Sequence, residues 1–300
     1  MTLDQLRIFV AVAERRHVTK AADALNLSQS AVSSAIAALE TQHDVRLFDR
    51  IGRGIDLTEE GAIFLDEARA LLARAENAVL ILDDLSKAPR GHLRIQASQT
   101  VASYWLPPKL VALKDRYPGI DVSLRIGNTA EASKAVTDGA ADLGFIEGDL
   151  PPSDLKRRVV AYDELVLVMP RDHPAADLAS FSEKDYRGFR WLLREPGSGT
   201  RSAAEQHFAG MGLSPNDIDI AMELPSNEAL LAAVAASRCV TMMSYRTTSA
   251  AQGQGLTARR VTWADRPIRP FAVLTHPDRH RTRAVQVLLD LLHETDPDRV

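Results

Sequence analysis

The chain has 300 residues, 45% of them hydrophobic and 25% charged, which is typical of a globular protein with a sizeable core. Its 36 basic and 40 acidic side chains give a net charge of −4, which argues weakly against nucleic-acid binding unless one small module carries it. The single cysteine excludes an intramolecular disulfide and a cysteine-based zinc site. The start MTLDQLRIF lacks a secretory signal, and no apolar run could span a bilayer. We therefore expect a cytoplasmic protein of two or three compact units without a membrane partner.

Three helices are predicted at the N-terminus. Apolar residues at helical spacing predict the first over residues 3–14. Thr19 is expected to cap a second helix over 20–25, and Ser28 a third over 29–42. Two short helices joined by a tight turn form the helix-turn-helix arrangement.

A hairpin is predicted directly after these helices. Strands over 46–49 and 55–57 flank the tip RIGRG at 50–54, where glycines allow positive φ. The hairpin would be the wing of a winged helix-turn-helix over residues 1–58.

A long helix is predicted over 58–86, with Thr58 as its cap and Glu59 and Glu60 in its first turn. Apolar and small residues alternate along it by fours and threes, as in a heptad seam: Gly61, Leu65, Ala68, Leu72, Ala75, Val79 and Leu82. We favour dimerisation through this seam; packing within one chain is the alternative. KAPRG at 87–91 then breaks the helix, so residues 59–90 would be linker and hinge.

Beyond the hinge, strands and helices alternate, which predicts an α/β fold with a mainly parallel sheet. Strands are expected at 93–97, 120–126, 143–147, 165–169, 191–193, 218–224, 240–244 and 271–275, with helices at 108–117, 129–138 and near the C-terminus. About 210 residues exceed one small sheet, so we expect two lobes. Lobe I would comprise 91–161 and 268–300, and lobe II 162–267.

Some side chains of the third helix and the wing are placed to meet a DNA duplex. They are Gln29, Ser30, Ser33, Ser34, Arg50 and Arg53. Glutamine pairs with adenine, serines reach phosphates or bases, and an arginine such as Arg53 can enter a minor groove. The alternative is an ordinary polar surface.

The run AADALNLSQSAVSSAIAALETQHDVRLFDRIGRGIDLTEEG at 21–61 resembles the DNA-binding segment of LysR-type transcriptional regulators. The pattern is AA-L-x-x-SQ-x-AVS-x-x-I-x-x-LE, then LF-x-R and LT-x-x-G. The resemblance implies an effector domain like periplasmic binding proteins and a homotetramer, commonly a dimer of dimers. A small coinducer would change DNA bending or promoter engagement, which leaves RNA polymerase open as a further partner.

By position in this resemblance, Gln29 and Ser33 fall where the family touches the major groove, and Arg50 and Arg53 fall on the wing. The chain departs from the family at Ser30, where proline is frequent. It also has small residues at Ser34, Ala35 and Ala37, where longer polar groups are frequent. We therefore expect few direct contacts to the bases, and more recognition through the DNA backbone or the DNA shape.

In open α/β sheets, ligands bind outside the carboxyl ends of the strands. That rule selects Ser98, Gln99, Thr100, Asn128, Thr129, Glu147, Ser198, Gly199, Thr200, Arg201, Ser226 and Asn227 as candidate effector-binding residues. The loop 196–201 has glycines, hydroxyls and Arg201, and a helix is expected from about Ser202, which suits a carboxylate, phosphate or sulfate. A structural turn is the alternative. The loop is similar to one in family members that respond to anionic metabolites.

Glu147 has three open roles: binding an ammonium group, pairing with an arginine, or a solvated carboxylate at a strand end.

An enzyme and a solute-binding transport protein are the rival classes. No G-x-S-x-G, Walker or G-x-G-x-x-G motif occurs, and no H-E-x-x-H, so we expect no catalytic residue, metal or cofactor. A transport protein would need an export signal, and it would not need the N-terminal winged helix-turn-helix over residues 1–58, which we call the head. Cys239 is predicted to be a core residue, with a thiol sensor left open.

Overall fold

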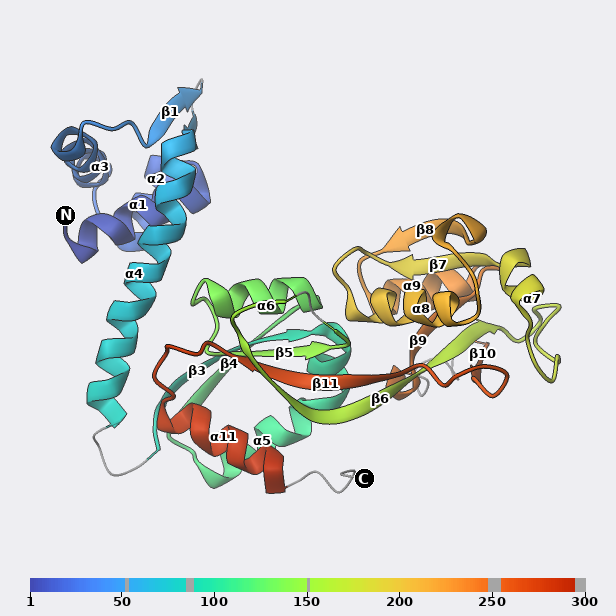
Figure 1. Cartoon of the computed structure of the whole chain (residues 1–300). Coiled ribbons are helices and arrows are strands. Elements are labelled where there is room, and N and C mark those ends of the chain that lie inside the picture. The colour runs from blue at the N-terminus through green and yellow to red at the C-terminus, as the bar shows by residue number, and fades with distance from the viewer. Residues whose placement is uncertain (52–53, 85–88, 150–151, 248–254, 295–300) are drawn as a thin grey trace. The chain divides into compact units, whose positions relative to one another are not determined.

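The computed structural model of the chain describes residues 1–51, 54–84, 89–149, 152–247 and 255–294 (Figure 1). Contacts divide the chain into two compact units, Met1–Leu85 and Ser86–Val300. The finer boundaries expected at residues 58 and 90, and within the second unit, stay predictions. Among the helices that the structure describes, none is long and apolar enough to cross a membrane.

The first unit opens with the three predicted helices, α1 (Leu3–Arg15), α2 (Val18–Leu25) and α3 (Gln29–His43). Ser28 caps α3 as expected, because its hydroxyl accepts a hydrogen bond from the Ala31 amide. The predicted cap of α2 was wrong. His17, not Thr19, accepts from the Lys20 amide, so α2 begins at Val18.

The wing consists of β1 (Phe48–Ile51) and β2 (Gly54–Leu57), each slightly displaced from the predicted strands, and leads into α4 (Glu59–Asp84). Glu40 holds the start of the wing, because its Oε1 accepts from the amides of Leu47 and Phe48 at 2.8 and 3.2 Å. Thr58 caps α4 and also donates to the Arg46 carbonyl at 2.8 Å. A Cβ on Gly61 would lie 2.1 Å from the Leu47 carbonyl oxygen, so only glycine lets α4 approach the wing this closely.

Part of the predicted seam of α4 packs inside the first unit. Ala68 is fully buried, and Leu65 and Leu72 contact the core of α1–α3, so there the intramolecular alternative holds. Leu71 and Val79 are 41% and 59% exposed within the chain. The hinge overlaps residues 85–88, which lie outside the described part.

The second unit begins with β3 (Gly91–Ser98), η1 (Val101–Trp105), α5 (Pro107–Arg116), β4 (Ile120–Gly127), α6 (Thr129–Thr137), β5 (Leu143–Glu147) and β6 (Lys156–Pro170). It continues with α7 (Glu183–Gly188), β7 (Arg190–Arg194), α8 (Gly199–Gly210), η2 (Pro215–Asp217), β8 (Asp219–Leu224), α9 (Asn227–Ala235), β9 (Thr241–Ser244), η3 (Tyr245–Thr247), β10 (Leu256–Arg260), β11 (Ile268–Thr275) and α11 (Arg283–Glu294). Helix α8 starts at Gly199 rather than near Ser202.

The expected mainly parallel sheet was wrong: the sheet is mixed. In that sheet β3 pairs in parallel with β4 and β5, while β7 and β8 form a separate two-stranded parallel sheet. Strand β11 is antiparallel to β5 and β6, and β6 is antiparallel to β9 and β10. The reason is the long strand β6, which pairs with β11 in its first half and with β9 and β10 in its second. It thereby carries the chain from lobe I to lobe II.

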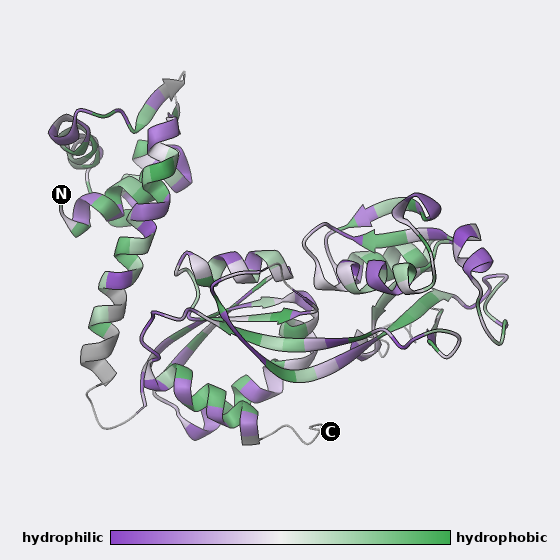
Figure 2. Cartoon of the chain, viewed as in Figure 1, coloured by the Kyte–Doolittle hydropathy of each residue, from purple (hydrophilic) through white to green (hydrophobic). Residues whose placement is uncertain are grey.

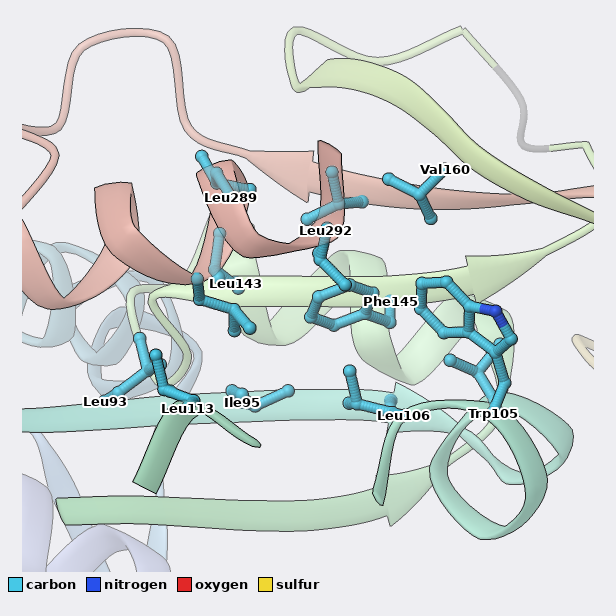
Figure 3. Close-up of a cluster of buried hydrophobic side chains, with 14 of the residues drawn as sticks. Leu93, Ile95, Trp105, Leu106, Leu113, Leu143, Phe145, Val160, Leu289 and Leu292 are labelled. Atoms are coloured by element: carbon cyan, nitrogen blue, oxygen red, sulfur yellow. The ribbon is translucent and has the colours of Figure 1, made fainter. Parts of the chain in front are cut away.

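Both lobes place helices on both faces of their strands. In lobe I, side chains of β3, β5 and α11 converge on one core, with Leu93, Phe145 and Leu289 among them (Figure 3). Helix α6 covers the other face. Figure 2 shows hydrophobic and hydrophilic residues alternating along α11, as a helix with one buried face requires. In lobe II, Cys239 is buried in a core beneath α9, as predicted.

Candidate functional site

The solvent face of α3 carries the predicted DNA-facing side chains. Gln29, Ser30, Ser33 and Ser34 are all exposed. The other face of the helix buries Val32, Ile36 and Leu39 in the core. This separation follows from helical periodicity, which turns the polar side chains near the start of α3 away from the apolar stripe.

A groove of about 900 Å³ runs between α3 and the wing. Gln29 and Ser33 line it on the helix side, and Arg46 lines it where the chain enters the wing. Arg46 is exposed and was missed by the sequence analysis, although a basic residue at the start of the predicted wing is a usable signal. Arg50 lies in β1 opposite Ile55, while Arg53 is outside the described residues.

In the second unit, the candidate effector residues meet where the two lobes touch. The Gln99 side chain accepts from the Asn227 amide at 2.8 Å, and the Asn227 side chain donates to Thr100 at 3.3 Å. The Thr200 hydroxyl donates to Glu147 Oε1 at 3.0 Å. Lobe I and lobe II are therefore joined directly by residues that the strand-end rule selected.

Gly199 allows the closest of these approaches. A Cβ at this position would lie 2.0 Å from the Glu147 carbonyl oxygen and 2.8 Å from Thr129 Oγ1. The Thr129 hydroxyl donates to the same carbonyl at 3.0 Å. The start of α8, where Ser198 is the cap, thus packs against the end of β5 with no room for a side chain.

A buried arginine that the sequence analysis missed lies at this junction. Arg269, on β11, donates to Asp163 Oδ2 at 2.8 and 3.0 Å and to Thr200 Oγ1 at 3.0 Å. Its Nη1 lies 3.3 Å from Glu147 Oε1, and all three charged side chains are 2% exposed or less. One guanidinium therefore faces two carboxylates in a buried site, where charges interact more strongly than at the surface.

The other candidate residues have local partners. Ser226 caps α9 and Asn128 caps α6, and the Asn128 side chain also donates to Glu195 across the lobes at 3.3 Å. Arg201 donates to Glu205 at 2.7 Å and to Glu223. Burial lowers the pKa of Arg201, but the hydrogen bonds that Arg201 donates to these carboxylates outweigh it and raise the pKa overall. The charge that the sequence analysis assigned to an anion is thus already balanced.

Some buried polar atoms in the described chain have no hydrogen-bond partner: Ser98 Oγ, Glu147 Oε2 and Arg246 Nε. The last forms a looser ion pair with Asp163 Oδ1 at 3.6 Å. Ser98 and Glu147 belong to the predicted set, and such atoms are costly to bury unpaired. Over the same described residues there is no group of three or more His, Cys, Asp or Glu side chains that could hold a metal ion.

Comparisons with known proteins match both units. Residues 3–62 match the family model "Bacterial regulatory helix-turn-helix protein, lysR family", and residues 86–297 match "LysR substrate binding domain". A "Probable RuBisCO transcriptional regulator" of Porphyra purpurea is 32% identical over 95% of this chain and 91% of that protein. The "Uncharacterized HTH-type transcriptional regulator YeiE" of Escherichia coli K12 is 31% identical over 97% of this chain and 96% of its own length.

Solved structures share the fold. A full-length variant of OxyR from Pseudomonas aeruginosa has a TM-score of 0.73 at 22% identity, covering 98% of this chain and 95% of that one. Full-length CbnR, solved in complex with its target DNA, has a TM-score of 0.72 at 22% identity over 99% and 100% of the two chains. The protein therefore belongs to the LysR family: it is a DNA-binding transcriptional regulator with a substrate-binding domain, and not an enzyme.

Proposed function

We propose that this regulator reads its operator with the exposed start of α3 and responds to a small anionic metabolite held between the two lobes. The observation that supports the DNA surface best is the exposed face of α3 with Gln29 and Ser33 beside the groove to the wing. In this proposal Gln29 and Ser33 contact base edges, Ser30 and Ser34 contact phosphates, and the free amides at the start of α3 attract phosphate.

The wing would contribute positive charge. Arg50 and Arg53 are its proposed contacts, with Arg53 in a minor groove. We add Arg46, because it is exposed and lines the same groove as Gln29. Phosphate contacts of this kind give affinity without base preference and weaken as salt rises.

The α3 assignment is tested with two glutamines on the same helix. Gln29→Ala should weaken binding to a selected operator by about 1–3 kcal/mol and relax base preference at one position. Gln42→Ala, also exposed but at the far end of α3, is the control and should bind like the wild type. Equal affinity and equal base preference of the two variants in gel-shift titrations would contradict this assignment.

The effector is proposed to lie where the lobes meet. The candidate contacts are Ser98, Gln99, Thr100, Asn128, Thr129 and Glu147 from lobe I and Ser198, Gly199, Thr200, Arg201, Ser226 and Asn227 from lobe II. The support for an anion is the start of α8 with the Thr200 hydroxyl and Arg269 beside it. Since Arg201 is balanced by Glu205 and Glu223, Arg269 is the better source of positive charge.

A thermal-shift screen of small anions on the full chain tests the effector proposal. A true ligand should raise the unfolding midpoint progressively with its concentration. Arg269→Lys removes the planar fork while keeping the charge and should reduce that shift. An undiminished shift in this variant would argue against a site beside Arg269.

Assembly is proposed to follow from α4. Leu71 and Val79 are exposed apolar residues on a helix whose earlier turns are already packed, so a second copy would cover them. A homotetramer built as a dimer of dimers is proposed, acting on operator DNA in the cytoplasm with RNA polymerase as a further partner.

A further inference from the structure

The carboxylate of Glu147 lies where an anionic effector would be expected. Its Oε1 accepts the Thr200 hydroxyl in the first turn of α8 at 3.0 Å and faces Arg269 Nη1 at 3.3 Å. The start of a helix, a hydroxyl and a guanidinium together form an arrangement that binds oxyanions. Here the chain itself supplies the oxyanion, and it comes from the opposite lobe to α8.

This internal carboxylate is only partly satisfied. Glu147 is 1% exposed, and its Oε2 has no hydrogen-bond partner. Burying a charged oxygen without a partner is unfavourable, so the present arrangement holds Glu147 less firmly than a fully bonded pair would. An anion with better-placed oxygens could therefore replace it.

The charges around Arg269 favour replacement over simple addition. Asp163 and Glu147 already face its guanidinium, with Arg246 at the edge of the cluster. A third negative charge among these buried groups would meet two like charges at close range, which disfavours binding. If Glu147 leaves as the anion arrives, the balance of charge is unchanged.

We propose that Glu147 is an internal competitor that determines how strongly the site binds anions. This inference rests on the proposed effector site between the lobes. An incoming carboxylate, sulfate or phosphate takes the Thr200 hydroxyl and the Arg269 guanidinium, and Glu147 moves out. Because Glu147 ends β5 and Thr200 lies in the first turn of α8, the same exchange breaks a direct bond between the lobes.

The test compares anion affinity in the full-length wild type, Glu147→Gln and Glu183→Gln, by calorimetry with acetate, sulfate and inorganic phosphate as separate probes. Glutamine keeps the shape of the side chain and an acceptor for Thr200 but removes the competing charge. Glu147→Gln should bind at least one of the anions about tenfold more tightly than the wild type, a shift of the size that losing one buried charge contact gives. Glu183, an exposed partner of Arg187 on α7, is the control and should leave affinity unchanged.

Equal or weaker anion binding by Glu147→Gln for all three probes, including no binding at all, would overturn the proposal. If that variant does not fold, Glu147→Ala replaces it, because alanine also removes the competing carboxylate; the same gain is required. The probe whose affinity increases most shows whether the site prefers a carboxylate, sulfate or phosphate. Operator binding by each variant is measured in parallel, so a failure of the DNA-reading role is seen separately.

Discussion

Glu147 and Thr200 are joined by a hydrogen bond of 3.0 Å that connects the end of a strand in lobe I to the start of a helix in lobe II. The bond is buried, and Arg269 contacts both residues. Two hydrogen bonds of Asn227, to Gln99 and Thr100, make a second connection nearby. Polar groups thus make direct connections between the lobes, and our proposal is that an anionic ligand exchanges one of these connections for its own contacts.

Removing Arg269 should destabilise the second unit strongly. Arg269→Met leaves Glu147 buried without its cation and Asp163 with only the looser pair to Arg246, and losing one member of a buried ion pair costs about 3–5 kcal/mol. The control is Arg266→Met, since Arg266 is 56% exposed and its partner Glu164 keeps a second cation, Arg260, at 3.9 Å. Urea unfolding of the two variants measures the difference, and equal stability would mean that the cluster contributes nothing to folding.

Gly61 should not tolerate a side chain. In Gly61→Ala the new Cβ would lie 2.1 Å from the Leu47 carbonyl oxygen, so α4 must move away from the wing at a cost of about 1–3 kcal/mol. Gly210→Ala is the matched control, because a Cβ there meets nothing within 4 Å. Thermal unfolding should show a lower midpoint for the first unit in Gly61→Ala only; an unchanged midpoint would contradict the close contact.

Lobe II should lose stability in mild acid through His207. Burial lowers the pKa of His207 below its ordinary value of 6.5, although a hydrogen bond with the backbone of Asp265 opposes this. The unfolded chain therefore binds a proton first, and stability present above pH 6.5 is lost as the pH falls, by at most about 1.4 kcal/mol per pH unit for one proton.

The comparison for this pH effect is His207→Gln, with His92→Gln as the control on an exposed histidine. Urea unfolding between pH 5 and 8 should depend less on pH in His207→Gln than in the wild type and the control. Identical pH profiles for all three proteins would exclude His207 as a source of the acid sensitivity.

Val79 should matter for assembly rather than for folding of the head. Val79→Glu places a charge on an exposed apolar position of α4, so sedimentation should show a smaller assembly at unchanged head stability. Ala68→Glu makes the opposite case, because Ala68 is fully buried against α1–α3 and a charge there should unfold the head. If Val79→Glu forms an assembly of the same size as the wild type, this face of α4 has no role in assembly.

Local sequence signals predicted the head well because its elements are defined by near neighbours. Ser28 and Thr58 cap the helices that they were expected to cap. The exception is His17, whose ring nitrogen replaced the hydroxyl of Thr19 as a cap. Histidine is not among the residues usually found as helix caps, so the sequence favoured Thr19.

The second unit was predicted less completely because its decisive contacts are distant in sequence. Arg269 and Asp163 are 106 positions apart, and nothing near either residue predicts their pairing. The mixed sheet has the same origin, since β6 pairs with β11 across a similar interval. The pairing of Arg201 with Glu223 was missed for the same reason, because Glu223 lies beside it in the fold but on another element.

The most direct test of this account is competition between genomic DNA fragments and random sequence for the purified, assembled protein at moderate ionic strength. The measurement is made without and with the small anions that pass the thermal-shift screen. We predict that some fragments are retained well above the random background, and that Gln29→Ala reduces this preference while Gln42→Ala does not. If every fragment binds no better than random DNA under all these conditions, the proposal that the protein reads a specific operator is contradicted.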